Sequence, residues 1–180
     1  MEALQPEWNE FLELLRRRGV RFVIVGALAM AAHGRPRYTQ DLDVLVDTTE
    51  ANARRLRTVL AEYGYASAAR AWRRFTKPYQ IFTLGREPLR IDILTSISGV
   101  SFRTAWRNRV AMKLGGGQLD VLGLVELRTN KAAAGRPKDL LDLALLDELV
   151  PIRAKARSRS SSRRRAARPS RTRGTVAPRR

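Results

Sequence analysis

Residues 21–47 read Arg-Phe-Val-Ile-Val-Gly-Ala-Leu-Ala-Met-Ala-Ala-His-Gly-Arg-Pro-Arg-Tyr-Thr-Gln-Asp-Leu-Asp-Val-Leu-Val-Asp, and this stretch decides the fold. A short apolar, mostly β-branched run over 22–25 predicts a strand that ends at Gly26. Small residues then predict a helix over 27–33, and the Gly and Pro that follow mark a turn. A second strand is expected over 42–46, so the stretch is a strand–helix–strand unit.

Two carboxylates stand one residue apart where the second strand begins, at Asp41 and Asp43. Alternate residues of a strand point to opposite faces, so both should emerge together, with Leu42 and Val44 on the other face. Adjacent carboxylates repel each other unless a cation lies between them, and hard oxygen ligands of this kind suit Mg²⁺. The pattern indicates metal-assisted phosphoryl or nucleotidyl transfer, and its structural alternative is a pair of solvated loop residues.

The segment from Gly26-Ala27 to Asp41-Leu-Asp43 resembles the signature of the DNA polymerase β-like nucleotidyltransferase superfamily, in particular the small bacterial AbiEii toxin-like proteins and minimal nucleotidyltransferases. That group has an apolar strand, Gly-Gly or Gly-Ser, a helix with His-Gly-x-Pro-Arg-x-Thr, and then Asp-hydrophobic-Asp; residues 33–40 here read His-Gly-Arg-Pro-Arg-Tyr-Thr-Gln. Ala27 replaces the group's Gly or Ser, which removes a hydroxyl contact to phosphate and keeps an amide contact. The resemblance implies an α/β fold, a mixed β-sheet with packed helices.

The superfamily also uses a third carboxylate on a later strand. Asp92 interrupts an apolar, β-rich run, Leu-Arg-Ile-Asp-Ile-Leu-Thr over 89–95. The resemblance implies that Asp92 completes a triad with Asp41 and Asp43, where it helps to hold a second ion or takes the proton from the attacking hydroxyl. Its structural alternative is an edge-strand residue that faces solvent.

A second block of resemblance covers residues 122–142, where a Lys near a helix end precedes Arg-x-Lys-Asp. The Gly-Arg-Pro within it fits a helix end followed by the first turn of the next helix. The family implies that Lys131 reaches the triphosphate, that Arg136 contributes to nucleotide binding, and that Asp139 orients the site. The structural alternative places Lys131 and Asp139 at helix ends of favourable polarity.

This resemblance implies a nucleotidyltransferase that moves a nucleoside monophosphate from an NTP to a hydroxyl, with Mg²⁺ or Mn²⁺ as cofactor. The toxin-like relatives suggest an RNA acceptor, particularly a tRNA end, and the minimal nucleotidyltransferases suggest a hydroxyl on a partner toxin or antitoxin protein. The alternative is a catalytically inactive antitoxin or nucleic-acid-binding module of the same fold. Ala27 favours that alternative, and the three-Asp set opposes it.

Charge divides the chain into two expected parts. The whole sequence carries 35 Lys and Arg against 17 Asp and Glu, a formal charge of +18. Residues 153–180 hold twelve of the basic residues and no acidic one, so the preceding part carries +6. We therefore expect a nucleotidyltransferase-like domain over 1–150 and a disordered Arg/Ser-rich tail over 151–180, which would bind nucleic acid nonspecifically or have no function.

Other features bound the function. The chain has no Cys, which excludes disulfides and Cys-based zinc sites. Neither a membrane span nor a signal-peptide pattern is recognisable, so the cytoplasm is the expected location. His33, the single histidine, is expected to be structural. Asp47 begins a capping-box pattern and is expected to cap a helix that runs to about Tyr63.

The remaining pattern predicts a first helix over 6–18, short strands near Tyr65 and over 79–84 and 89–94, a hairpin over 110–122, and two final helices. The aromatic and basic segment over 72–75 either stacks on a base or covers the edge of the sheet.

Overall fold

The structure is a computed structural model that describes residues 4–36, 38–114 and 117–148. The helices are α1 Pro6–Arg17, α2 Gly26–Ala32, α3 Glu50–Glu62, α4 Ala66–Arg70, α5 Phe102–Arg107, α6 Leu124–Ala134 and α7 Pro137–Asp147, with a 3-10 helix, η1, over Trp72–Thr76. The strands are β1 Phe22–Ile24, β2 Asp41–Val46, β3 Ile81–Leu84, β4 Arg90–Leu94, β5 Val110–Leu114 and β6 Gly117–Val121. The chain divides after Leu146, and the sheet belongs to the first unit.

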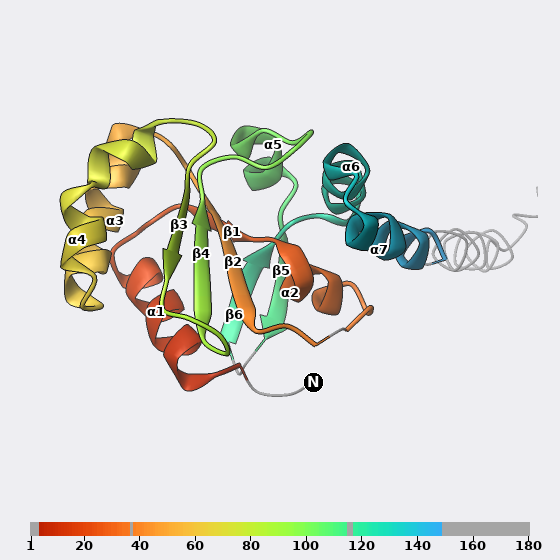
Figure 1. Ribbon diagram of the computed structural model, residues 1–180, viewed down its shortest axis with the longest axis horizontal. Coiled ribbons are helices and arrows are strands. Elements are labelled where there is room, and N and C mark those ends of the chain that lie inside the picture. Colours follow the sequence, from red (N-terminus) through yellow and green to blue (C-terminus); the bar gives the residue numbers. More distant parts are fainter. Residues whose placement is uncertain (1–3, 37, 115–116, 149–180) are drawn as a thin grey trace, which may run out of the picture. The chain divides into compact units, whose positions relative to one another are not determined.

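The six strands form one mixed sheet in the order β3-β4-β2-β1-β6-β5. The β2–β4 and β1–β6 pairs are parallel, and the other three pairs are antiparallel. Figure 1 shows the sheet at the centre of the first unit, with helices around it. The expected α/β fold, a mixed sheet with packed helices, is therefore confirmed.

The main core lies where α1 and α3 pack against one face of the sheet. Helical spacing of apolar residues in α1 predicted its buried face, which contains Phe11 and Leu15, both with no exposed surface. Alternate strand residues such as Val44 and Ile93 belong to the same hydrophobic cluster. Burial of this face fixes the orientation of β2 and β4, and their intervening residues must point to the opposite face.

One local prediction is wrong, and an alternative left open at a neighbouring segment is decided. The strand expected near Tyr65 is instead the short helix α4, because Ala66 to Arg70 are small or straight-chain residues that favour a helix. The segment over 72–75 is the 3-10 helix η1, in which Trp72 and Phe75 are buried. These rings belong to the core and do not stack on a base, and Phe75 packs against Phe82 of the edge strand β3, with ring centroids 4.0 Å apart, which favours the alternative that the segment covers the sheet edge.

Asp47 lies just before α3 but is not its N-cap, which is Thr49. The Asp47 carboxylate accepts hydrogen bonds from the Thr49 amide, at 3.3 Å, and from Arg21 Nη1, at 2.8 Å. Its role is to tie the end of β2 to the residue before β1, and the capping prediction is corrected accordingly.

The second half of the unit follows the prediction more closely. Gly135 ends α6 in the left-handed conformation, with φ of 62°, and Pro137 opens α7. His33 is buried and its Nε2–H donates to the Leu122 carbonyl at 2.7 Å, so the expected structural role of the histidine is confirmed. The helix α5 was not expected; Ser101 caps it by accepting from the Thr104 amide.

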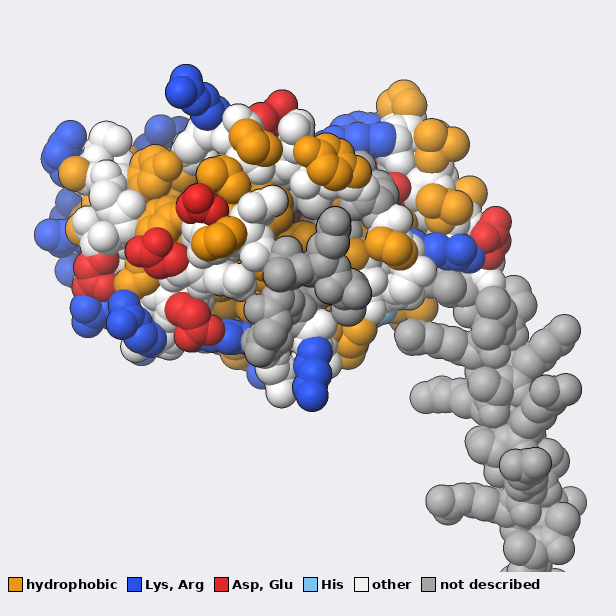
Figure 2. Space-filling view, turned by 90° about the horizontal axis from the view of Figure 1, so that it is seen from below, with side chains coloured by type: hydrophobic (Ala, Val, Ile, Leu, Met, Phe, Trp, Pro, Cys, Tyr) orange, Lys and Arg blue, Asp and Glu red, His pale blue; other side chains and the backbone are white. Residues whose placement is uncertain are grey.

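The last two helices expose several large hydrophobic side chains. Val125, Leu140, Leu141 and Leu145 are exposed, and Figure 2 shows hydrophobic side chains gathered at the end of the first unit where α6 and α7 lie. Within the described ranges, none of the helices combines the length and hydropathy that a bilayer crossing needs. The expected tail over 151–180, the turn glycines 115–116 and Arg37 lie outside the described residues.

Candidate active site

Strand register brings the three predicted carboxylates together. In the parallel β2–β4 pair, Asp43 lies opposite Asp92, and Asp41 lies opposite Arg90. Residues that pair directly project from the same face of a sheet. The carboxylates of Asp41, Asp43 and Asp92 therefore share the face that α1 and α3 do not cover, and all three line one cavity of about 320 Å³.

Gly26 supplies the space that Asp43 occupies. Its φ is 63°, and a Cβ added there would lie 1.9 Å from Asp43 Oδ2. The Val25 amide donates to the Asp43 carbonyl at 3.1 Å, which fixes the strand beside the turn. Glycine at the start of α2 is thus required twice, once by the backbone conformation and once by the close approach of the carboxylate.

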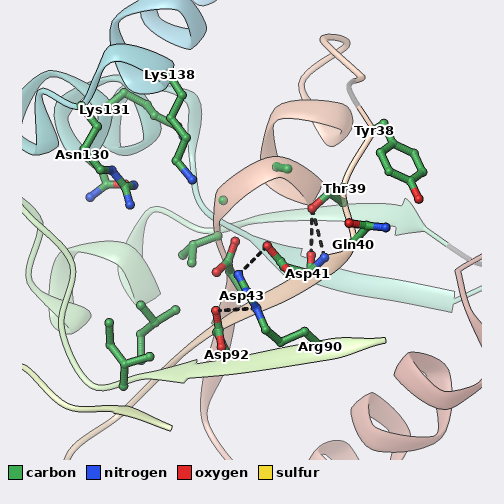
Figure 3. Close-up of a pocket in the computed structure, with 16 residues that line it drawn as sticks. Tyr38, Thr39, Gln40, Asp41, Asp43, Arg90, Asp92, Asn130, Lys131 and Lys138 are labelled. Carbon is green, nitrogen blue, oxygen red and sulfur yellow. Dashed lines mark hydrogen bonds and ion pairs between the residues drawn. The ribbon is translucent and has the colours of Figure 1, made fainter. Parts of the chain in front are cut away.

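Arg90 lies between the outer two carboxylates (Figure 3). Its Nη2 donates to Asp41 Oδ2 at 2.7 Å, and its Nε stands 3.4 Å from Asp92 Oδ2. The other oxygen of Asp92 accepts from Thr83 Oγ1 at 2.7 Å, across the β3–β4 pair. Asp41 Oδ1 is buried and has no hydrogen-bond partner among the described residues.

The electrostatics of the cluster are dominated by like charge in a partly dry site. Burial raises the pKa of the Asp43 carboxyl, and the neighbouring Asp92 and Asp41 carboxylates raise it further. Lys138 and, less strongly, Lys131 oppose that rise. A group arranged in this way is stabilised by added positive charge, which is the condition under which a carboxylate cluster binds a cation.

Lys131 lines the cavity wall, but its ammonium is engaged in a buried ion cluster. Its Nζ lies 2.8 Å from Asp139 Oδ1 and 2.7 Å from Asp142 Oδ2, and all three side chains are buried. Arg136 Nε also donates to Asp139. Burial would raise the pKa of Asp139, but the hydrogen bonds from Arg136 and Lys131 outweigh it and hold that pKa below its ordinary value. The cluster joins the end of α6 to the start of α7.

Lys138 is the cation that extends from α7 toward the carboxylates (Figure 3). It is exposed, it lines the cavity, and its charge lowers the pKa of Asp43 more than that of Lys131 does. Gly26, Ala27 and Arg136 also line the cavity. The structure thus gathers every sequence-predicted site residue except Asp139 at the cavity, and Asp139 lies behind it, bonded to Lys131.

The donor chemistry of this site fits a divalent metal. Carboxylate oxygens are the ligands that Mg²⁺ prefers, and the orphaned, buried Oδ1 of Asp41 is an acceptor that lacks a donor in the described part of the chain. As the side chains stand, no three His, Cys, Asp or Glu groups of the described residues are already set to chelate one ion. Arg90 stands between Asp41 and Asp92.

Three contributors to the site were not predicted from sequence. Arg90 was detectable, because it precedes Asp92 by two residues on one strand and must share its face. Thr83 required the β3–β4 register, which no local pattern encodes. Lys138 required knowledge of where α7 packs.

Comparison with known proteins identifies a family. A sequence model of the aminoglycoside-2''-adenylyltransferase family matches residues 8–101, a span from α1 past β4 that includes all three carboxylates. No protein of curated function gives a significant sequence match.

Two solved structures are similar in fold. The solution structure of the antibiotic-resistance factor ANT(2'')-Ia has a TM-score of 0.52 and 12% sequence identity, covering 89% of this chain and 94% of that chain. A candidate nucleotidyltransferase from Thermotoga maritima has a TM-score of 0.47 and 16% identity, covering 87% of this chain and 97% of the other.

Proposed function

The chain belongs to the aminoglycoside-2''-adenylyltransferase family, and from that premise we propose where and how it acts on a nucleotide. It is a nucleotidyltransferase. We place the transfer of a nucleoside monophosphate from an NTP at the cavity of Asp41, Asp43 and Asp92. The acceptor oxygen forms a bond to the α-phosphorus of the NTP, the bond from that phosphorus to the bridging oxygen breaks, and pyrophosphate leaves.

One observation carries this proposal above the others: three carboxylates share one sheet face, and the central one packs against a glycine that no other residue can replace without a clash. Asp41 and Asp43 would hold Mg²⁺ or Mn²⁺ together with the triphosphate, and Asp92 would assist or accept the proton of the attacking hydroxyl. The metal, when bound, neutralises charge on the phosphates and orients them. Asp92 is positioned for its role by the hydrogen bond from Thr83.

Other residues that line the cavity supply positive charge and backbone amides. We assign the phosphate contact to Lys138, because its exposed ammonium extends into the cavity while that of Lys131 is held by two carboxylates. Lys131 then acts with Asp139 to fix the α6–α7 junction that carries Lys138. Gly26 allows the backbone to approach the phosphates, and Ala27 offers an amide with no hydroxyl.

Charge at the cavity favours an anionic acceptor. Lys138 extends into it and Arg90 and Arg136 also line it, so the phosphates of a nucleic-acid acceptor would meet positive side chains there. We propose RNA, with a tRNA end as the narrower case, and a hydroxyl of a partner protein as the alternative acceptor. Either of these two acceptors would be consistent with an AbiEii-like protein of a cytoplasmic toxin–antitoxin system. An aminoglycoside is the acceptor that the family name suggests.

A noncatalytic module is the second candidate. Ala27 supports it, because a nucleotidyltransferase-fold antitoxin or nucleic-acid-binding module has no need of a phosphate-binding hydroxyl. The three carboxylates oppose it, since a module that binds no metal gains nothing from gathering on one sheet face mutually repelling carboxylates that raise the pKa of Asp43.

The deciding experiment measures label transfer from each of four α-³²P NTPs, with Mg²⁺ or Mn²⁺, into total RNA, total protein and an aminoglycoside with a 2''-hydroxyl. Asp43→Asn is the test variant; it should remain folded, because it removes a carboxylate whose pKa is raised by burial. Asp120→Asn is the matched control, since Asp120 lies on β6, forms an ion pair with Arg109 and does not line this cavity.

We expect label in the RNA fraction with wild type and Asp120→Asn, and a loss of at least about a hundredfold with Asp43→Asn. Label in the aminoglycoside alone would show that the acceptor is an aminoglycoside and not RNA, and the protein would still be a nucleotidyltransferase. Folded wild type that labels none of the three, with any NTP, would transfer our support to the noncatalytic module.

A further inference from the structure

Arg90 occupies the space between two carboxylates that the proposed reaction needs for metal. Its guanidinium donates to Asp41 Oδ2 at 2.7 Å and lies 3.4 Å from Asp92 Oδ2, with Glu87 Oε1 also at 3.4 Å on its outer side. Figure 3 shows the guanidinium between the two strands, on the side of the sheet where Asp43 also projects. A positive side chain therefore already compensates the cluster.

The backbone, and not a loose surface contact, puts Arg90 there. It is the register partner of Asp41 in the parallel β2–β4 pair and precedes Asp92 by two residues on β4, so it must project from the same face as both. Its side chain is one-third exposed, which leaves it room to turn outward. A group built into the sheet at this position is a constant neighbour of the carboxylates in every folded copy.

The polar atoms around Arg90 are incompletely satisfied. Within the described residues, Arg90 Nε and Asp41 Oδ1 are both buried without a hydrogen bond, although one charge-assisted bond joins the two side chains through other atoms. Buried donors and acceptors are normally paired, and unpaired ones mark places where a ligand or a rearrangement completes the set. Here the unpaired atoms are the Nε of the Arg90 guanidinium and the Oδ1 of the Asp41 carboxylate, and a divalent metal would also bind that carboxylate.

We propose that Arg90 is a built-in counter-ion that competes with the divalent metal for Asp41 and Asp92. In the resting protein the guanidinium offsets the repulsion among the three carboxylates. When the site is loaded it turns away, toward Glu87 or toward the negative charge of the arriving triphosphate. This inference rests on the proposed function, because it concerns the residues assigned there to metal binding.

Competition of this kind couples the metal to the nucleotide. Metal alone must displace a charge-assisted hydrogen bond and approach a fixed positive charge, so it binds weakly. Phosphate oxygens give the displaced guanidinium new acceptors, and metal binding then becomes tighter. Arg90 would in this way keep the site closed to free divalent ions until an NTP is present.

The test measures Mn²⁺ binding to the full chain by calorimetry and by the electron paramagnetic resonance signal of free Mn²⁺, with and without a non-hydrolysable NTP analogue. The variants are Arg90→Gln, Arg90→Lys and, as a control, Arg86→Gln. Arg86 is exposed, lies on the β3–β4 connection just before the strand of Arg90 and does not line the cavity, so its replacement removes one nearby charge and leaves the carboxylates untouched.

We expect Arg90→Gln to tighten Mn²⁺ binding without nucleotide by about tenfold or more and to reduce the tightening that the analogue produces. In EDTA, the same variant should melt at a lower temperature than wild type, because the carboxylates have no counter-ion, and Mn²⁺ should remove this difference. Arg86→Gln should match wild type in all three measurements. Arg90→Lys keeps the charge without the planar fork, and it should tighten Mn²⁺ binding severalfold; it decides the question if Arg90→Gln does not fold.

The proposal that Arg90 competes with the metal would be overturned if folded Arg90→Gln bound Mn²⁺ no more tightly than wild type. If Arg90→Gln does not fold, the same result in Arg90→Lys would overturn it. If wild type still binds Mn²⁺ with the analogue in that case, and Asp43→Asn does not, the proposed function stands without it. Absence of Mn²⁺ binding from every variant, with the analogue present, would overturn both.

Discussion

At the scale of single residues, the site depends on a contact between a main-chain α-carbon and a carboxylate. Gly26 leaves no room for a side chain, because any Cβ would lie 1.9 Å from Asp43 Oδ2. The same residue also has a left-handed backbone, with φ of 63°. The first property concerns function and the second concerns stability, and the chain offers a way to separate them.

We predict that Gly26→Ala lowers stability and abolishes nucleotidyl transfer, whereas Gly19→Ala affects stability alone. Gly19 has nearly the same backbone angle, φ of 64°, but an added Cβ meets nothing within 4 Å. Each alanine should cost about 1–2 kcal/mol from the left-handed conformation. Gly26→Ala also displaces Asp43, so its turnover should fall by about a hundredfold or more. Urea unfolding and label transfer measure the two effects, and equal activity in both variants would contradict the prediction.

Residue-level inference from the sequence was strongest where spacing alone fixes geometry. Two residues separated by one on a strand share a face whatever the rest of the fold does, so Asp41 and Asp43 could be paired from the sequence. Lys131 shows the limit of such inference. Its position beside the cavity follows from the motif, but its two buried carboxylate partners depend on how α7 packs against α6.

At the scale of elements, the junction between α6 and α7 is held by charge in the interior. Lys131 contacts both Asp139 and Asp142, and all three side chains are almost inaccessible. Removing one member leaves another charged and buried, which costs far more than breaking an exposed ion pair. The junction also carries Lys138 toward the cavity, so its rigidity matters for the site.

We predict that Asp139→Asn destabilises the protein by about 3–5 kcal/mol at neutral pH, because Lys131 and Arg136 lose their shared partner. The control Asp120→Asn breaks a pair whose two side chains are about one-third exposed, and it should cost about 0–1 kcal/mol. The pKa of Asp139 is lowered in the folded state, so its stabilisation is complete above the ordinary pKa of 3.8 and is lost as the pH falls below it. Urea unfolding from pH 7 to pH 3 should therefore show a shallower acid dependence in Asp139→Asn than in wild type. An identical slope would contradict the assignment.

Element prediction failed where helix and strand signals were both weak. The segment around Tyr65 has aromatic residues that favour a strand, yet the alanines after it form α4, which packs beside α3. Tertiary packing decided the outcome, since Ala69 and Trp72 bury their side chains there. By contrast, α1 and β2 have a clear apolar period, and their observed bounds differ from the expected ones by one residue.

At the scale of the whole molecule, the distribution of charge separates the nucleotidyltransferase domain from the C-terminal segment. The twelve basic residues over 153–180 account for most of the net charge of +18. The described residues that line the cavity all precede Leu146. We propose that residues 151–180 form a separate basic tail.

We predict that a chain ending at Val150 transfers label to a short acceptor at the wild-type rate but binds long RNA more weakly. Every phosphate that the shortened chain no longer neutralises reduces the dependence of log K on log salt by about 0.7–0.9. Filter binding between 50 mM and 200 mM salt should therefore give a distinctly shallower slope for the shortened chain. An unchanged slope would show that the tail does not contact RNA.

The register of the β2–β4 pair affects how wrongly folded copies of the protein are removed in the cell. Arg90 and Asp92 alternate with Ile91 and Ile93 along β4, and the two isoleucines are buried in the core. If β4 paired one residue out of step, a guanidinium and a carboxylate would enter the core, and two isoleucines would enter the solvent. A misassembled copy would therefore be unstable as well as inactive, and proteases would remove it. The alternation that positions the carboxylates also ensures that copies which persist in the cell are those with the site correctly assembled.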